Sequence, residues 1–453
     1  MKEVHDYYHK GFEEAEKKNL QHGRRIGSEL KMPLVSENGE AVDIGIIDKL
    51  WEYLGDNGWE KITDAHSGKV TGARKMGEHN HTLASCETGY CKTEFSLSHV
   101  GDLFELKEAV EELRAELGPF AKKHNVHFLA YGIHPVTKPG KHLLMKSKGR
   151  SQVWNKTFGA NRILHEDDGD DVNIFTVNAA SHVHISVSKE EAVRSVNILN
   201  GFSGAQIALT AHSNIWKREI DPDHKCVSEM FWDWWIPDGK RIGVPEKEFS
   251  DLEDYVSTIN DFKPVFVKRD GKPVILDYES FRDYFARDKA EGEYPDGTKI
   301  DLVPHESDID LHSTCYWFNT RITRYYTVEN RANDQQPPKE MPVIAALTLG
   351  LISAPEKSLS VLRQYKWEDL RELRSEACKK GMAAESGDVK AHRLAEEMLE
   401  CAREGLVSRE KGEEIFLKPL FERLIKKENP ADEIENIFKK GGVKALIDSR
   451  TFC

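Results

Sequence analysis

Four short segments of the chain each place charged or imidazole side chains two positions apart. The pairs are Glu29 and Lys31, Lys92 and Glu94, His182 and His184, and Glu329 and Arg331. Side chains alternate across a β-strand, so residues two apart share a face. A strand at each segment would direct its pair to one side of a sheet. Inward-facing groups of this kind are costly unless they contact a ligand, a metal ion or one another.

The chemistry that these residue types favour is binding of a divalent cation and an anion. Carboxylates with an occasional imidazole are typical ligands of Mg²⁺ or Mn²⁺, whereas thiolate-rich sites favour Zn²⁺. Arg331, beside Glu329, would lie against a phosphate group. Each pair taken alone also fits an exposed strand face, hydrogen-bonded structural histidines or a structural ion pair.

Apolar periodicity predicts the elements that would position these pairs. We expect helices at 4–22, 101–124, 189–200 and 203–212, a buried helix at 341–352, and strands at 25–35, 126–131, 177–187 and 322–331. The first strand should stop near Pro33, and 138–172 is typical of a long loop. Strands this scattered favour an α+β domain at 1–354. Leu, Glu, Lys and Arg dominate after Pro355, which predicts a helical C-terminal extension at 355–453 packed on that domain.

Composition restricts the class of protein. The 453 residues are 39% hydrophobic, enough for a large core, and 64 Lys and Arg against 77 Asp and Glu give a formal charge of −13. This charge argues against nonspecific attraction to nucleic acid or anionic membranes. The sequence has no apolar run of the ~20 residues that span a bilayer, no apolar signal region and an odd number of cysteines, seven. We expect a cytoplasmic protein, monomeric or homodimeric, that acts on small molecules.

The order of the segments resembles the glutamate–cysteine ligase family of the plant and proteobacterial type. These carboxylate–amine ligases belong to the glutamine-synthetase-like superfamily, and the similarity runs from about residue 25 to 430. The family's Gly-x-Glu-x-Glu strand is similar to 26–31 (IGSELK), its Glu-Thr block to 87–95 (ETGYCKTEF), and its Gln-Val-His strand to 182–185 (HVHI). Further similar blocks are 132–135 (GIHP), 148–151 (KGRS), 211–216 (AHSNIW), 311–321 (LHSTCYWFNTR) and 328–331 (VENR).

The resemblance implies a fold and a reaction. The fold is a curved, mainly antiparallel sheet that forms a funnel-shaped active site, with helices on its outer face. The reaction uses ATP with Mg²⁺ or Mn²⁺ to phosphorylate an acid, and an amine then displaces phosphate from the acyl phosphate. The product would be a γ-glutamyl amide of cysteine or another amine.

The resemblance also implies roles for particular residues. The metal ligands would be Glu29, Glu87, Glu94, His184 and Glu329. The catalytic residues would be Arg331, Arg321 and Glu329. The nucleotide would contact Lys148, Arg150, His182 and Arg331. The substrates would contact Lys92, Trp216, Trp232 and Arg150.

Three positions depart from the family pattern. Lys31 stands where relatives have a second carboxylate, so a metal position is lost or replaced by an ammonium group. His182 replaces a glutamine, and the segment 227–229 lacks an arginine that would hold a substrate carboxylate. Two other interpretations therefore stay open. One is a metal-dependent amide hydrolase, in which His182 and His184 assemble a Zn²⁺ site with His134, His79 and His81. The other is a non-catalytic ligand-binding descendant of the ligases.

Overall fold

The computed structural model describes residues 2–64, 67–77, 80–145, 153, 172–235 and 239–453. Its largest sheet has nine strands within these residues. They are β1 (Ile26–Ser36), β2 (Glu60–Thr63), β3 (Val70–Met76), β4 (His81–Cys86), β5 (Lys92–Ser96), β6 (Val126–Phe128), β7 (Ser181–Ser186), β16 (Thr320–Ile322) and β17 (Thr327–Asn330). The spatial order is β16-β17-β7-β1-β5-β4-β3-β2, and β6 pairs with the end of β1. Every pairing in this sheet is antiparallel, as predicted.

The two faces of this sheet differ in polarity. One row of directly paired residues, Leu30, Phe95, Ala84 and Ala73, is fully buried in the hydrophobic core. The residues next to them along the strands, such as Glu29 and Glu94, point to the opposite face because side chains alternate. The central sheet therefore has one apolar face and one polar face.

Strand β1 differs from the prediction at its end, because it continues through Pro33 to Ser36. Pro33 lacks a backbone N–H and would normally interrupt the ladder. Here β1 changes partners on one side: its pairing with β7 ends at Leu30, and its pairing with β6 begins at Leu34. Pro33 falls between the two partners, where the missing donor costs little.

The expected strand at 322–331 is also different, because the structure has a hairpin there. Strand β16 ends at Ile322, and β17 begins at Thr327. In the turn, the Thr323 N–H donates to the Thr327 carbonyl at 2.9 Å, and Tyr326 has a positive φ of 59°. Sequence pattern missed this turn because residues 322–328 are β-branched or aromatic except for Arg324, and they include no glycine or proline.

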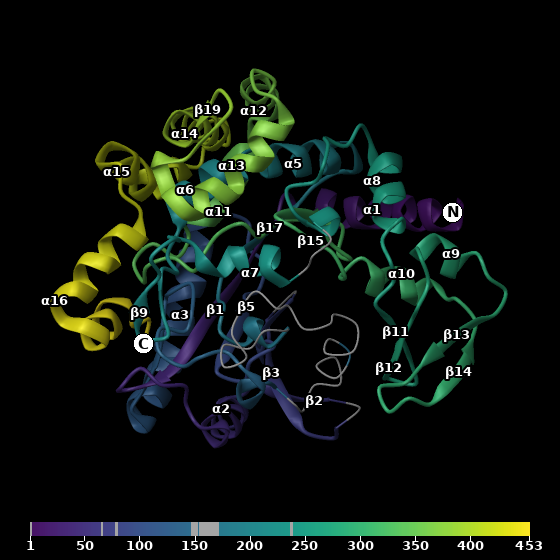
Figure 1. Ribbon diagram of the computed structural model, residues 1–453, viewed down its shortest axis with the longest axis horizontal. Coiled ribbons are helices and arrows are strands. Elements are labelled where there is room, and N and C mark those ends of the chain that lie inside the picture. Colours follow the sequence, from purple (N-terminus) through teal and green to yellow (C-terminus); the bar gives the residue numbers. More distant parts are fainter. Residues whose placement is uncertain (1, 65–66, 78–79, 146–152, 154–171, 236–238) are drawn as a thin grey trace.

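Helices cover the apolar face and extend beyond it (Figure 1). They are α1 (Lys2–His22), α2 (Ile44–Asp56), α3 (Leu103–His124), α5 (Lys189–Gly201), α6 (Ser203–Thr210), α7 (Val227–Trp235), α8 (Leu252–Asn260), α9 (Phe281–Phe285), α10 (Glu306–His312), α11 (Val343–Ser353), α12 (Pro355–Leu362), α13 (Trp367–Lys380), α14 (Ala391–Val407), α15 (Lys418–Lys426) and α16 (Pro430–Arg450). Helices α5 and α11 pack on β7 and its neighbours, and α2 packs on β2 and β3. None of the helices in the described part of the chain has the length and apolarity to cross a membrane.

The segment after Pro355 is mainly helical. Helix α14 packs on α11, and α13 packs on α6, so the hydrophobic core continues from residues before 355 to residues after it. Gly350 of α11 permits this close approach, because a Cβ there would lie 2.3 Å from the Ala402 carbonyl oxygen of α14. The chain then returns to the central sheet, where Thr451 bridges to Leu129.

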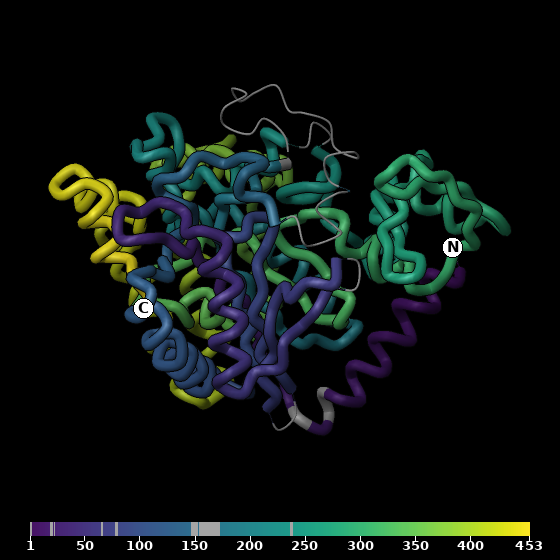
Figure 2. Tube along the Cα trace, turned by 90° about the horizontal axis from the view of Figure 1, so that it is seen from below, coloured from purple at the N-terminus to yellow at the C-terminus, as the bar shows by residue number. Residues whose placement is uncertain are grey.

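A smaller four-stranded sheet stands apart from the main body (Figure 2). Helix α10 packs on this sheet and also contacts α1. Its strands are β11 (Phe266–Arg269), β12 (Lys272–Ile275), β13 (Ala290–Glu293) and β14 (Lys299–Leu302). The remaining strands form short pairs: β8 (Ile215–Trp216) with β9 (Glu219–Ile220), β10 (Ile242–Gly243) with β15 (Trp317–Phe318), and β18 (Glu385–Ser386) with β19 (Val389–Lys390).

Candidate active site

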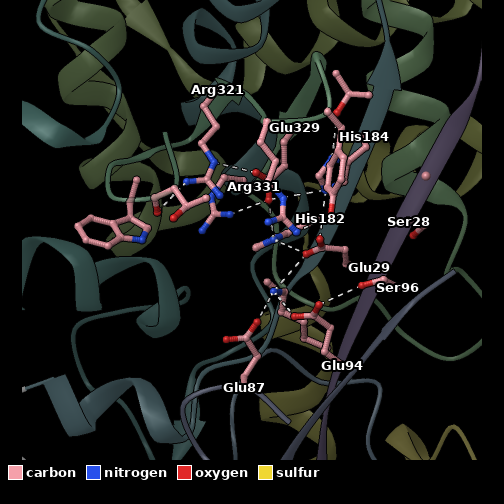
Figure 3. A pocket seen from close by; sticks show the side chains of 18 of the residues that line it. Ser28, Glu29, Glu87, Glu94, Ser96, His182, His184, Arg321, Glu329 and Arg331 are labelled. Carbon is pink, nitrogen blue, oxygen red and sulfur yellow. Dashed lines mark hydrogen bonds and ion pairs between the residues drawn. The ribbon is translucent and has the colours of Figure 1, made fainter. Parts of the chain in front are cut away.

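The polar face of the central sheet forms the floor of a cavity of about 1120 Å³. All four sequence-predicted pairs line it, and they come from the adjacent strands β5, β1, β7 and β17. The register sets Glu29 opposite His182, Lys31 opposite Glu94, and Glu329 opposite His184. Four segments that are far apart in sequence therefore present their polar side chains to one space (Figure 3).

Glu329 lies at the centre of an ion-pair network and is only 2% exposed. Its carboxylate accepts a hydrogen bond from Arg321 Nε at 2.8 Å and one from an Arg331 guanidinium nitrogen at 2.6 Å. Burial alone would raise the pKa of Glu329, but the two arginines outweigh burial and hold that pKa well below its usual value. Glu329 is thus a permanent anion that orients two cations at the cavity wall.

Glu29 connects this network to the two histidines. Its Oε2 lies 3.1 Å from His182 Nδ1, and its Oε1 lies 3.2 Å from His184 Nε2. Ligand atoms of Glu29, His182 and Glu329 all lie within 4.8 Å of one another. Burial, with help from nearby Lys31, lowers the pKa of His182, so its imidazole is neutral and can act as a ligand.

This set fits one divalent cation of the kind that carboxylates and a neutral imidazole bind. It contains His182, whereas the predicted metal set contained His184. The ring of His184 points its Nε2 toward Glu29. Its Nδ1 lies 3.2 Å from the Thr327 hydroxyl.

Lys31 occupies the other part of the cavity floor. Its Nζ lies 2.6 Å from Glu94 Oε2, 2.9 Å from Glu87 Oε1 and 3.2 Å from Glu29 Oε2. Burial opposes the charge on Lys31, but the three carboxylates outweigh it and raise the pKa of this ammonium well above its usual value. Three of the five predicted metal ligands therefore hold an ammonium group.

Lys92, a predicted substrate contact, lines the cavity next to this cluster. Its Nζ donates to the Phe175 carbonyl at 3.0 Å and to Asn178 Oδ1 at 2.7 Å. Burial lowers the pKa of Lys92 to about 8. The side chain thus connects β5 to the segment that precedes β7.

The two predicted tryptophans lie in different surroundings. Trp232 of α7 lines the cavity and stacks on Trp317 at a centroid distance of 5.4 Å. Trp216 is not among the described residues that line the cavity, and its indole N–H donates to Asp221 at 3.0 Å. Lys148 and Arg150 lie outside the described residues.

Asp334 is a cavity residue that sequence reasoning missed. It is buried, and it accepts hydrogen bonds from the backbone N–H of His212 at 2.6 Å and from the hydroxyls of Ser213 and Ser228. Burial raises the pKa of Asp334 to about 6. The only signal in the sequence was the polar run at 333–336, which follows the predicted strand at 322–331. This run has neither a strand period nor a helix period.

The segment 227–229, which lacks the family's arginine, receives one from the C-terminal helices. Arg374 of α13 donates to Glu229 Oε1 at 2.8 Å and to Asp233 Oδ2 at 2.5 Å. Arg374 is itself buried and is not among the described residues that line the cavity. Its guanidinium therefore supports α7, which carries Trp232, from behind.

Comparison with known proteins adds independent information. The model of the glutamate–cysteine ligase family 2 matches residues 59–449. The chloroplastic glutamate–cysteine ligase of Medicago truncatula is 24% identical over 346 residues, which are 74% of this chain and 62% of the relative. That of Solanum lycopersicum is 27% identical over 215 residues, 45% of this chain and 39% of the relative. The chain thus spans less than two thirds of the length of these relatives.

A solved structure extends the likeness to the fold. The crystal structure of glutamate–cysteine ligase from Francisella tularensis in complex with AMP aligns with a TM-score of 0.55 over 94% of this chain and 87% of that chain. Sequence identity in this alignment is 10%, so the likeness concerns the fold alone. Because the family model matches most of the chain, this protein belongs to glutamate–cysteine ligase family 2, the family that its sequence motifs resemble.

Proposed function

We propose that the cavity is the active site of an ATP- and Mg²⁺-dependent carboxylate–amine ligase that forms a γ-glutamyl amide through an acyl phosphate. The observation that carries this proposal is the grouping of Glu29, His182 and Glu329 with Arg321 and Arg331 at one end of the cavity. Phosphoryl transfer needs this combination of a cation site and guanidinium groups, because its catalysis consists mainly of positioning and charge stabilisation.

Each group has a distinct part in this mechanism. A Mg²⁺ ion held by Glu29, His182 and Glu329 would supply positive charge to the phosphate oxygens of ATP. Arg321 and Arg331 stabilise the charge that develops on the transferred phosphoryl group. Glu329 holds both guanidiniums in position, so no arginine has to reorganise during the reaction.

The cavity also has the dimensions for two ligands. Sites for drug-sized molecules commonly have volumes of about 300–1,000 Å³, and this cavity of about 1120 Å³ accommodates a nucleotide with a small acid. The aromatic wall at Trp232 and Trp317 and the ammonium of Lys92 border the substrate end. Nucleotide contacts from Lys148 and Arg150 stay predictions, as do the glutamine-synthetase-like funnel, the division at residue 354, the oligomeric state and the cytoplasmic location.

The hydrolase interpretation gains no support from the histidines. His134 is buried away from His182 and His184: its Nδ1 accepts the Thr137 N–H at 3.2 Å, and it is not among the described cavity-lining residues. His134 therefore does not join His182 and His184 in a zinc site. His81 does line the cavity, and His79 lies outside the described residues. The non-catalytic interpretation is tested below.

The test is ADP release by the purified protein with Mg²⁺–ATP, glutamate and a panel of amines that includes cysteine. Glutamate labelled with ¹⁸O in its carboxylates should transfer one ¹⁸O atom to phosphate per amide formed, because the acyl phosphate loses a carboxylate oxygen with the phosphate. Glu329→Gln should abolish both signals.

Three results would contradict the proposal: ADP release that needs neither acid nor amine, phosphate without ¹⁸O, or release of AMP and pyrophosphate. Binding of Mg²⁺–ATP without turnover on any acid and amine would support the non-catalytic interpretation instead. An exposed control, Glu60→Gln on β2, should leave turnover unchanged.

A further inference from the structure

The acidic cluster Glu29, Glu87 and Glu94 is arranged around a residue of the chain itself. Its carboxylates come from β1, from the connection after β4, and from β5, and they converge on Lys31 at 2.6–3.2 Å. Lys31 is only 8% exposed, and its register with Glu94 on the neighbouring strand fixes its position. The backbone of the central sheet therefore determines where this ammonium lies.

Lys31 Nζ donates hydrogen bonds to Glu87 Oε1 and Glu94 Oε2, and its contact with Glu29 Oε2 is an ion pair. An ammonium group has three N–H donors and no acceptor, which matches three surrounding carboxylates. Divalent Mg²⁺ would require oxygen atoms at about 2.0–2.1 Å, and it would have to displace the ammonium from the same space. Like charges at such short range also need a compensating cation, because carboxylates that share a buried site cannot all remain ionised alone.

Nearby cations do not replace this group. Lys92 lies next to the cluster, but its Nζ donates to the Phe175 carbonyl and to Asn178 Oδ1. Arg331 is oriented by Glu329. Among the described residues, Lys31 is thus the cation that contacts all three carboxylates.

We propose that the ammonium of Lys31 is a resident cation of the active site, in the position that a second divalent ion would otherwise occupy. Among the residues that the structure describes, the protein then takes up a divalent ion only at Glu29, His182 and Glu329, and Glu29 is shared between the two positions. That the remaining divalent position is used rests on the proposed function; the role of Lys31 does not. A tethered ammonium is always present and does not depend on metal concentration.

The test is the number of Mn²⁺ ions that the full chain binds, measured by the electron paramagnetic resonance signal of free Mn²⁺ and by calorimetry. Wild type should bind one ion, and Lys31→Gln, which keeps the length of the side chain but removes its charge, should bind two. Without divalent ions Lys31→Gln should also melt at a lower temperature than wild type, and Mn²⁺ should raise its melting temperature more.

Two matched variants serve as controls. Lys31→Arg keeps the charge and should still bind one Mn²⁺. Lys92→Gln removes the charge of another buried lysine on the same sheet face and should also bind one. If Lys31→Gln folds only when Mn²⁺ is present, that result supports the proposal. If Lys31→Gln does not fold with or without Mn²⁺, the number of ions on Lys31→Arg is the test: one ion supports the proposal, and two ions overturn it.

Two Mn²⁺ ions on wild type or on Lys31→Arg, or no additional ion on folded Lys31→Gln, would overturn the proposal. Failure of the proposed function gives a different result. In that case wild type would bind no Mn²⁺, while Lys31→Gln would bind one.

Discussion

Removing the Glu329 carboxylate should destabilise the fold as well as the reaction. Glu329→Ala leaves Arg321 and Arg331 without the anion that lies 2.8 and 2.6 Å from them, in a wall where their side chains are each 13% exposed. Loss of one partner from a buried ion pair costs about 3–5 kcal/mol, because the other charge remains desolvated. We therefore expect the free energy of unfolding to fall by about that amount, and turnover is better measured with the isosteric Glu329→Gln.

Urea denaturation followed by tryptophan fluorescence measures this loss. The matched control is Glu60→Ala, which breaks a bidentate pair with Arg74 at the sheet edge, where the two side chains are 59% and 43% exposed. Solvent screens exposed ion pairs, and they contribute little to stability, so this midpoint should barely move. Adding Arg321→Met to Glu329→Ala should recover part of the stability by removing one unpaired charge. Equal midpoints for Glu329→Ala and Glu60→Ala at unchanged denaturant dependence would refute the reasoning.

Three further predictions concern the site, acid stability and helix packing. Arg331→Ala should lower the rate of ADP formation by about a hundredfold or more, and a rate close to wild type would reject its role. His312 is buried and neutral, with Nε2 2.7 Å from the Ile259 carbonyl, and burial lowers its pKa to about 3. The unfolded state therefore binds an extra proton below about pH 6.5, so stability falls as the pH falls from 6.5 to 3. In His312→Gln the slope of unfolding free energy between pH 4 and 6 should be smaller by up to about 1.4 kcal/mol per pH unit; equal slopes would contradict this. Gly350→Ala should cost about 1–3 kcal/mol in urea unfolding, since its Cβ would meet the Ala402 carbonyl, and an unchanged midpoint would show that α11 and α14 can separate.

Sequence pattern predicted which side chains share a face, but not which strands are neighbours. Alternation alone places Glu29 with Lys31 and His182 with His184, because that period is a local property of the strand. Pairing of β1 with β7 and of β7 with β17 joins segments far apart in sequence, and only tertiary packing determines it. The family resemblance, rather than the pattern, indicated that the segments meet.

Details of the site depended on features that no local pattern contains. His182 and His184 are equivalent by alternation, and only their side-chain directions decide which one joins Glu329 in the candidate metal set. Glu87 precedes β5 in a connection, so its contact with Lys31 could not be expected from strand period. The expected end of β1 at Pro33 was wrong for a different reason. Proline lacks the N–H that a strand ladder needs, but β1 changes partners at this position, so the missing hydrogen bond costs little.

The order of strands in the central sheet also constrains how the protein can form. Strand β7 is bordered by β1 on one side and by β17 on the other, and the Gln335 amide donates to the Lys31 carbonyl across 304 positions of sequence. Contacts between such distant segments form slowly, because long stretches of chain must close first. During synthesis, the edge of β7 that pairs with β17 stays unpaired until residues near 330 leave the ribosome. Unpaired strand edges favour aggregation. Fragments that end before β17 should therefore accumulate as insoluble material, even though they carry most of the cavity's acidic residues.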